Sequence, residues 1–209
     1  IAVGLDGGVE YALEGSVFVG GAVIQWLRDE LRFFPESRDA EYFAQKVSDN
    51  GGVYLVPAFT GLGAPYWDMY ARGMLIGLTR GTRREHITRA AQESIAYQVA
   101  DLARAMEADT GVPLTALKAD GGGQPGRVFD AVPGGHPGAH GAAARHPGDH
   151  GAGGGLPGGA GRGVWADREE LSRLWRCDTT FTPAMEPEER ERLLSNWRRA
   201  VDRCRGWAK

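Results

Sequence analysis

Apolar residues recur along most of this chain with the spacings of strands and amphipathic helices. Two short runs, residues 9–13 and 53–56, are rich in β-branched or aromatic side chains and have glycine nearby, which predicts strands. Residues 22–31 predict a helix that opens after Gly20 and Gly21 and closes before Pro35, because large apolar side chains recur there at helical spacing. These side chains are Val23, Trp26, Leu27 and Leu31.

The most regular helical pattern follows Thr82. The segment Thr82-Arg83-Arg84-Glu85 has the sequence of a capping box, in which the threonine hydroxyl and the glutamate carboxylate each accept a hydrogen bond from an unpaired backbone N–H. Gly111 and Pro113 end the helix, because glycine turns the chain and proline cannot continue it. The apolar positions between these signals are Ile87, Ala91, Ile95, Val99, Leu102 and Met106.

A further strand and a second amphipathic helix complete the pattern. Residues 114–119 predict a strand that leads into Asp120-Gly121-Gly122-Gly123, and Pro187 begins a charged helix. The apolar side of this helix comprises Leu193, Leu194, Trp197, Val201 and Cys204. Strands that alternate with helices predict an α/β domain over residues 1–209.

Composition narrows the classes of protein to which this domain belongs. Of its 209 residues 42% are hydrophobic, which is ample for a buried core, and the net charge of −3 comes from interspersed acidic and basic residues. We therefore expect no nucleic-acid partner and no membrane partner. The longest apolar run, residues 17–27, is interrupted by Gly20, Gly21 and Gln25, so it predicts neither a membrane span nor a secretory signal.

Two further observations bear on where the protein works. Cys177 and Cys204 are the only cysteines and lie far apart, so they indicate neither a disulfide framework nor a zinc site, and a reducing cytoplasm fits. The first residue is Ile1 rather than methionine. We therefore expect a fragment of a longer cytoplasmic protein, with the formation of a homo-oligomer left open.

Residues 124–163 differ in composition from the rest of the chain. Glycine, proline, alanine and histidine dominate, Leu156 is the only leucine and isoleucine is absent. Such a segment buries too little apolar surface to offset its ordering entropy, so its printed residues predict a disordered insert. Its histidines form two i, i+4 pairs, at positions 136 and 140 and at 146 and 150, which is a metal-ligand spacing on a helix. The surrounding glycine and proline disfavour a helix, so we assign no metal site.

The most specific stretch is Val-Pro-Ala-Phe-Thr-Gly-Leu-Gly-Ala-Pro-Tyr-Trp-Asp at residues 56–68, followed by Ala-Arg-Gly-Met-Leu-Ile-Gly-Leu-Thr-Arg-Gly at residues 71–81. It resembles the centre of the C-terminal half of glycerol kinases. The resemblance begins near Tyr11, runs to Gly122, and resumes from about Trp165 to Trp207. Residues 73–93 also resemble the second signature of the wider FGGY carbohydrate kinase family, with Gln92 where that family usually has an apolar residue.

The unmatched segment has a second explanation. When residues 130–137 are back-translated and read from the second base of the Asp130 codon, the codons permit Met-Gln-Phe-Gln-Ala-Asp-Ile-Leu, which is the kind of sequence that glycerol kinases carry there. The same displacement from His150 to Gly163 permits a family-like buried helix. We hypothesise that two compensating frame errors, one near residues 123–126 and one near Gly163, have altered residues 124–163 of an ordinary domain.

Gly21 and Gln25 are the best candidates for a nucleotide site. They lie one helical turn apart and so share a face, and Gly21 stands at a glycine-rich helix start where backbone donors and a missing side chain favour close approach by a nucleotide. Taken alone, a Gly-x-x-x-Gln spacing is a weak signal that fits a packing glycine and a solvated glutamine. The resemblance implies that both residues bind ATP, as in the Gly-Ala-x-x-Gln pattern of glycerol kinases.

The glycine-rich exit of the predicted strand at residues 114–119 is a second candidate. Such an exit is a usual place for a nucleotide to meet backbone amides, although a simple turn would look the same. The resemblance assigns a nucleotide contact to Gly122. It also expects an asparagine four residues later, where this chain has Gly126.

The remaining polar and aromatic candidates are assigned to the scaffold. His86 and Glu93 lie near a helix start, where a residue is more often a cap or a surface group than a catalyst. Trp67, Asp68 and Arg72 lie in a loop that contains glycine and proline, and such residues more often hold a loop against its domain than catalyse. We assign none of them a chemical step.

The resemblance implies the actin-like ATPase fold related to ribonuclease H, in which two α/β domains close around ATP and substrate, with this chain as the second. It implies transfer of the ATP γ-phosphoryl group to a terminal hydroxyl of glycerol, giving sn-glycerol 3-phosphate in glycerol breakdown. That reaction needs in-line positioning, Mg²⁺ to offset phosphate charge, and a carboxylate that takes the hydroxyl proton. In the family this carboxylate comes from the first domain, so we expect no catalytic residue here and no activity from these residues alone.

Two alternatives stay open. A kinase for another polyol or sugar, such as a xylulokinase relative, would share the fold, although those sister kinases match residues 57–68 less closely. A non-catalytic nucleotide-binding module would retain the ATP domain and lack the substrate domain. The coding sequence upstream of Ile1 distinguishes them, because a Gly-Asp-Gln motif supports the kinase and a start codon directly before Ile1 supports the module.

Overall fold

The computed structural model of the chain describes residues 2–3, 8–119, 140–143, 179–181 and 185–209. Strands and helices alternate through these residues, as the sequence predicts for an α/β domain. In chain order the elements are β1 (Ala2–Val3), β2 (Val9–Glu10), α1 (Ala22–Asp29), α2 (Asp39–Ala44), β3 (Tyr54–Val56), β4 (Met74–Ile76), α3 (Arg84–Thr110), β5 (Ala116–Ala119), β6 (His140–Ala143), β7 (Thr179–Phe181) and α7 (Pro187–Cys204).

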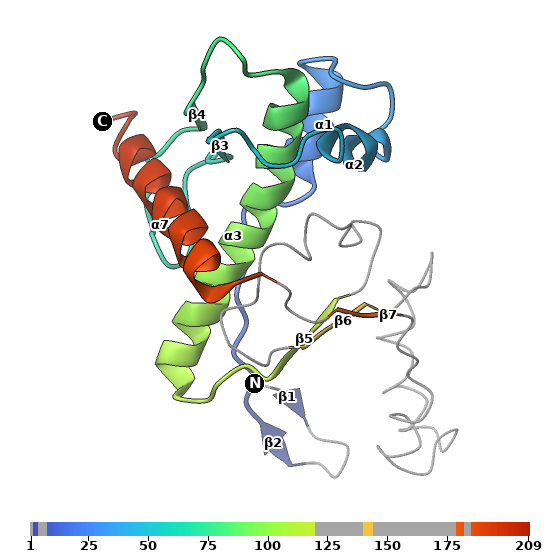
Figure 1. The fold of residues 1–209 in the computed structure, drawn as a ribbon. Helices are drawn as coiled ribbons and strands as arrows, with labels where there is room; N and C mark the ends of the chain where they lie inside the picture. The colour runs from blue at the N-terminus through green and yellow to red at the C-terminus, as the bar shows by residue number, and fades with distance from the viewer. Residues whose placement is uncertain (1, 4–7, 120–139, 144–178, 182–184) are drawn as a thin grey trace.

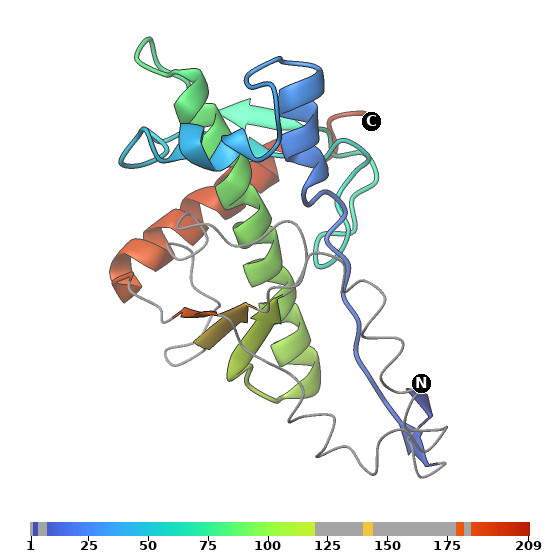
Figure 2. The ribbon, with the colours of Figure 1, turned by 90° about the vertical axis from the view of Figure 1, so that its right-hand side faces the viewer.

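The strands form three small sheets. β1 pairs with β2 and β3 pairs with β4, both antiparallel, while β5 pairs with β6 in parallel and β6 with β7 antiparallel. The three-stranded sheet lies toward the C-terminal end of α3, whereas β3 and β4 lie toward its N-terminal end (Figures 1 and 2). The long helix α3 therefore spans the described structure and links the two regions.

The core lies on both sides of β3 and α3. Successive side chains of β3 and of Val53 just before it point to opposite faces, so Tyr54 and Val56 join one buried cluster while Val53 and Leu55 join the other. The first cluster includes the apolar side of α7, and the second includes α1 and α2 residues. Figure 1 shows this arrangement, with α7 on one side of α3 and the pair α1 and α2 on the other.

The C-terminal helix agrees closely with its sequence pattern. α7 begins at Pro187, whose ring presets the backbone of a first helical residue. Of the apolar positions predicted for it, Leu194, Trp197, Val201 and Cys204 are buried and Leu193 is partly buried. This helix packs on the core with one face only, so a single apolar stripe describes it well.

Helix α3 begins differently from the prediction. The residue that precedes it is Arg83, whose backbone N–H donates to His86 Nδ1 at 3.1 Å, so His86 takes the place predicted for Glu85. Thr82 Oγ1 instead accepts a hydrogen bond from the Thr79 N–H at 2.9 Å, within the turn before the helix. The capping box predicted from Thr82 and Glu85 is therefore wrong, because the turn engages the threonine hydroxyl first. The predicted end is confirmed at Gly111, which adopts a left-handed φ of 68°.

The buried face of α3 also differs from the predicted stripe. Of the six predicted apolar positions only Ala91 is fully buried, and the other five are half-buried. Small and polar residues are buried instead, because the helix is covered on two sides and at close range. The Thr88 and Ser94 hydroxyls are not left unpaired, because they donate hydrogen bonds to the carbonyl oxygens of Arg84 and Ala91, at 2.8 and 2.7 Å.

Two N-terminal elements are shorter than predicted. β2 ends at Glu10, because its partner β1 offers only two residues for pairing, and Tyr11 and Leu13 are exposed. α1 ends at Asp29 rather than Leu31, since Arg32 turns the chain with a φ of 55° and leaves Leu31 40% exposed.

The segment at residues 124–163 lies mostly outside the described residues. The exception is β6, in which His140–Ala143 pairs with both β5 and β7. The prediction of a disordered insert is therefore wrong at these four positions, because strand pairing uses backbone groups that small residues also possess. His140 lies in this strand, and His136, its partner in the i, i+4 pair, lies outside the described residues.

Candidate functional site

Helix α1 presents Gly21 and Gln25 on one exposed face. The opposite face buries Val23 and Leu27 completely, so the orientation of the helix is set by its apolar side. The Gln25 N–H donates to the Gly21 carbonyl oxygen at 3.2 Å, which places the two residues one turn apart. A Cβ built at Gly21 meets no atom within 4 Å. The structure therefore brings the two predicted residues together beside open space.

The segment before α1 is held against the core. The Gln98 side chain on α3 donates from Nε2 to the Val19 carbonyl oxygen at 3.1 Å. The Phe18 ring covers Gly63 so closely that a Cβ there would lie 2.6 Å from Phe18 Cε1. Trp26 packs on Phe59 with ring centroids 5.1 Å apart. These contacts fix where the exposed face of α1 stands relative to α3 and the loop at residues 59–63.

The third predicted contact, Gly122, lies outside the described residues, as does Gly126. The strand that leads to it is described and begins at Ala116, two residues later than predicted. The structure thus places two of the three predicted residues, Gly21 and Gln25, on one exposed face, and the nucleotide contacts of all three stay predictions.

A second polar site is centred on Glu93. Its carboxylate is 4% exposed and accepts hydrogen bonds from Asn50 Nδ2 at 2.7 Å, Arg89 Nε at 2.9 Å and the Tyr97 hydroxyl at 3.2 Å. Burial raises the pKa of Glu93 and of Tyr97, and the Arg89 guanidinium opposes the shift on Glu93. Asn50 joins Glu93 to the loop at residues 48–52, while Arg89 and Tyr97 lie one turn away on α3 itself, which supports the scaffold role expected for Glu93. His86 Nδ1 accepts a hydrogen bond from the Arg83 N–H, which supports the scaffold role expected for His86.

The Glu93 network forms the floor of a cavity of about 640 Å³. The cavity lies between residues 48–52, the end of β4, α3 and one side of α7. Neither Gly21 nor Gln25 lines it, so it is separate from the exposed face of α1. Sequence patterns did not single out this cavity. The one sequence feature that marks the cavity is the run of arginines on α7, and a single sequence does not distinguish such a run from a solvated helix face.

The loop at residues 66–72 is held by Asp68 and Arg72, as expected. Asp68 Oδ1 accepts the Tyr70 N–H at 2.9 Å, and Oδ2 accepts the Gly206 N–H at 2.8 Å. Desolvation raises the pKa of Asp68, but these backbone donors outweigh it and hold the pKa below its usual value. Arg72 donates to the Ala71 carbonyl oxygen at 2.7 Å. Trp67 differs, since its side chain is 77% exposed and does not hold the loop.

Other candidate chemistry is limited within the part of the chain that the structure describes. Cys204 is a free, buried thiol, and burial raises its pKa to about 11, so it is not a nucleophile at neutral pH. No group of three His, Cys, Asp or Glu side chains could hold a metal ion among these residues. None of the described helices is both long enough and apolar enough to cross a membrane.

Comparison with known proteins identifies what this arrangement resembles. Residues 3–128 match the model of the C-terminal domain of the FGGY family of carbohydrate kinases. The chain is 52% identical over 207 residues to a glycerol kinase of Clostridium beijerinckii, covering 99% of this chain and 42% of that protein. It is 53% identical over 208 residues to a glycerol kinase of Symbiobacterium thermophilum, covering 100% of this chain and 42% of the relative. The chain thus spans 42% of the length of these curated relatives.

Solved structures agree with the fold. A glycerol kinase of Plasmodium falciparum, crystallised with ADP, superposes with a TM-score of 0.78 at 28% identity, covering 88% of this chain and 37% of that one. A ligand-bound xylulose kinase of Lactobacillus acidophilus superposes with a TM-score of 0.70 at 22% identity, covering 88% and 38%, and shows the fold alone. The predicted fold, a C-terminal domain of the actin-like kinases, is confirmed.

Proposed function

The chain belongs to the FGGY family of carbohydrate kinases, and on that premise we propose that it forms the nucleotide-binding C-terminal half of an enzyme that phosphorylates glycerol. The reaction transfers the γ-phosphoryl group of ATP to a terminal hydroxyl of glycerol and gives sn-glycerol 3-phosphate. Sequence identity favours glycerol as the substrate. About half of the residues match curated glycerol kinases along the whole chain, and among the superposed structures the identity is 28% for the glycerol kinase and 22% for the xylulose kinase.

The chain contributes nucleotide positioning to this reaction. Gly21 lacks a side chain at an exposed helix start, where a nucleotide can come close to the backbone, and Gln25 offers an amide on the same face. Phosphoryl transfer depends mainly on positioning and on the neutralisation of phosphate charge. Gly122 completes the nucleotide contacts in this proposal. Mg²⁺ offsets phosphate charge in such reactions.

The proton acceptor belongs to the part of the relatives that this chain does not match. The relatives extend over more than twice the matched length, since the chain covers 42% of each. We therefore expect these 209 residues to bind nucleotide without turning over glycerol, and the intact protein to act as the kinase.

The Gln25 side chain tests the nucleotide assignment. Gln25→Ala should weaken ATP binding to the intact protein several-fold, because the loss of one hydrogen bond to a ligand costs about 0.5–1.5 kcal/mol. Glu30→Ala, at the exposed far end of α1, is the matched control and should leave the ATP affinity unchanged. Titration calorimetry measures both variants. Equal ATP affinities for Gln25→Ala and wild type, with folding retained, would refute the assignment.

For residues 124–163 we propose that the two frame displacements are real. The family-model match ends at residue 128, close to where the composition changes, and this supports the proposal. Coding DNA read one base later should specify an apolar, helix-forming segment with an asparagine near Gly126, which would complete the nucleotide site. Resequencing the gene tests this directly. Confirmation of the printed reading frame, or an intact-protein mass that matches the printed composition, would contradict the proposal.

A further inference from the structure

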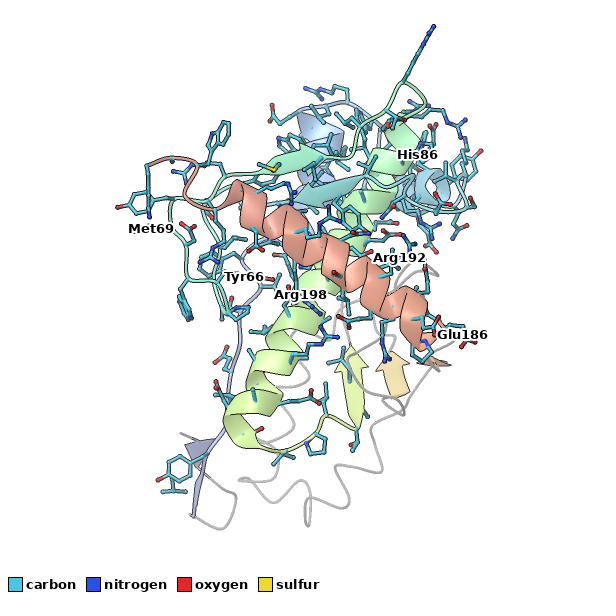
Figure 3. The ribbon with its side chains drawn as sticks, turned by 60° about the vertical axis from the view of Figure 1, so that its left-hand side comes forward. Tyr66, Met69, His86, Glu186, Arg192 and Arg198 are labelled. Atoms are coloured by element: carbon cyan, nitrogen blue, oxygen red, sulfur yellow. The ribbon has the colours of Figure 1, made fainter. Side chains whose placement is uncertain are left out.

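One side of α7 forms a wall of the cavity above the Glu93 network. Arg192, Asn196, Arg199 and Arg203 recur there at intervals of three or four residues and all line the cavity. Residues 48–52 and the end of β4 form the opposite wall. Figure 3 shows Arg192 on the side of α7 turned toward the β3 and β4 region, while Arg198 lies on a different side of the helix.

The opposite wall is set in place by Gly77. Gly77 has a left-handed φ of 89°, and a Cβ there would lie 2.0 Å from the Gly52 carbonyl oxygen. Only glycine allows β4 to end this close to the loop at residues 48–52. The shape of this wall is therefore set by the backbone.

Most charges around the cavity are already compensated. Arg89 forms an ion pair with Glu93 at 2.9 Å, and Arg192 donates two hydrogen bonds to Glu189 at 2.7 and 2.6 Å. The Asp49 carboxylate accepts the Gly51 N–H at 2.8 Å, which lowers the pKa of Asp49.

Arg199 and Arg203 are not compensated by an acidic side chain in this way. Arg199 donates to Asn196 Oδ1 at 2.8 Å, and Arg203 donates to the Arg199 carbonyl oxygen at 2.8 Å. Across the described residues, neither guanidinium has a carboxylate within ion-pair distance. Each guanidinium has five N–H donors, so several on each side chain point to no acid. Two like charges one turn apart repel each other unless an anion lies between them.

We propose that this cavity binds a small organic molecule carrying one phosphate group, held by Arg199 and Arg203. The planar guanidinium fork matches phosphate oxygens with paired hydrogen bonds, and two forks on one helix face can clasp one phosphate. A volume of about 640 Å³ suits a phosphorylated monosaccharide or a molecule of similar size. Asp49 and Glu189 line the same cavity toward the start of α7, so that end repels a second anionic group and offers acceptors to ligand hydroxyls.

The test uses glucose 6-phosphate as the probe and glucose as its phosphate-free counterpart, with the intact protein. Calorimetry should detect glucose 6-phosphate binding to wild type and none for glucose. The double variant Arg199→Gln/Arg203→Gln should bind glucose 6-phosphate at least tenfold more weakly. Arg198→Gln, on the same helix but outside the cavity, is the matched control and should bind as wild type does. Saturating ADP should leave the affinity unchanged, because the α1 face lies outside this cavity.

A second variant guards against unfolding as the cause of lost binding. Arg203→Lys keeps the positive charge and loses the fork, so its affinity should fall between those of wild type and the double variant. Thermal unfolding of all variants should match wild type, since both arginines are exposed. The proposal is overturned if wild type does not bind glucose 6-phosphate, if the double variant binds it equally well, or if ADP displaces it.

Discussion

Replacing Trp197 by alanine should lower the free energy of unfolding by about 3–5 kcal/mol, the range for an aromatic side chain removed from a core. Trp197 is fully buried on α7 and stacks on Tyr97 of α3, with ring centroids 5.3 Å apart. Its indole Nε1 also donates to Asp101 Oδ2 at 2.6 Å, and the Tyr66 hydroxyl donates to the same oxygen at 2.6 Å. The substitution leaves a cavity and removes one of two donors to a buried carboxylate, so both effects destabilise the fold.

Trp207 provides the matched control. It lies three residues beyond the end of α7 and is 71% exposed. Trp207→Ala should therefore change the free energy of unfolding by no more than about 0.5 kcal/mol. Urea unfolding followed by circular dichroism measures both variants. Similar stability losses for the two tryptophans would mean that α7 does not pack on α3 as described.

The contrast between α7 and α3 shows how far sequence patterns reach. The apolar spacing of α7 predicted its buried face because that helix packs with one side only. α3 is buried on two sides, and its buried polar residues find partners from distant segments. Glu93 pairs with Asn50 and Asp101 with Trp197, 43 and 96 positions away. Local periodicity contains no information about such pairs.

Sequence patterns also predicted only part of the candidate sites. Helical spacing predicted that Gly21 and Gln25 share a face, but only the burial of Val23 and Leu27 shows that this face is exposed. The cavity beside α7 joins segments from four parts of the chain, so no local pattern could have predicted it. The start of α3 was mispredicted for a local reason, because the turn at Thr79 competes for the Thr82 hydroxyl.

Gly21→Val should reduce the ATP affinity of the intact protein at least tenfold, which corresponds to about 1.4 kcal/mol of binding free energy. Valine would place a branched side chain where the nucleotide must come close to the backbone. The variant should still fold, because Gly21 has a φ of −55° and a Cβ there meets no atom within 4 Å. The expected loss is thus one of binding without a loss of stability.

Gly81→Val is the matched control for this variant. Gly81 is an exposed glycine before α3, and a Cβ there meets only Thr79 Oγ1, at 3.7 Å. ATP affinity from calorimetry and the midpoint of thermal unfolding are measured for both variants. If Gly21→Val binds ATP as tightly as Gly81→Val does, the exposed face of α1 is not the nucleotide site.

Product identification with the intact protein tests the central claim most directly. The protein is incubated with ATP and Mg²⁺ in the presence of glycerol or xylulose, and the phosphorylated products are identified by mass spectrometry. The account predicts glycerol 3-phosphate, formed in step with ADP, and little product from xylulose. Turnover of ATP with xylulose but not with glycerol, or no glycerol-dependent turnover at all, would contradict it.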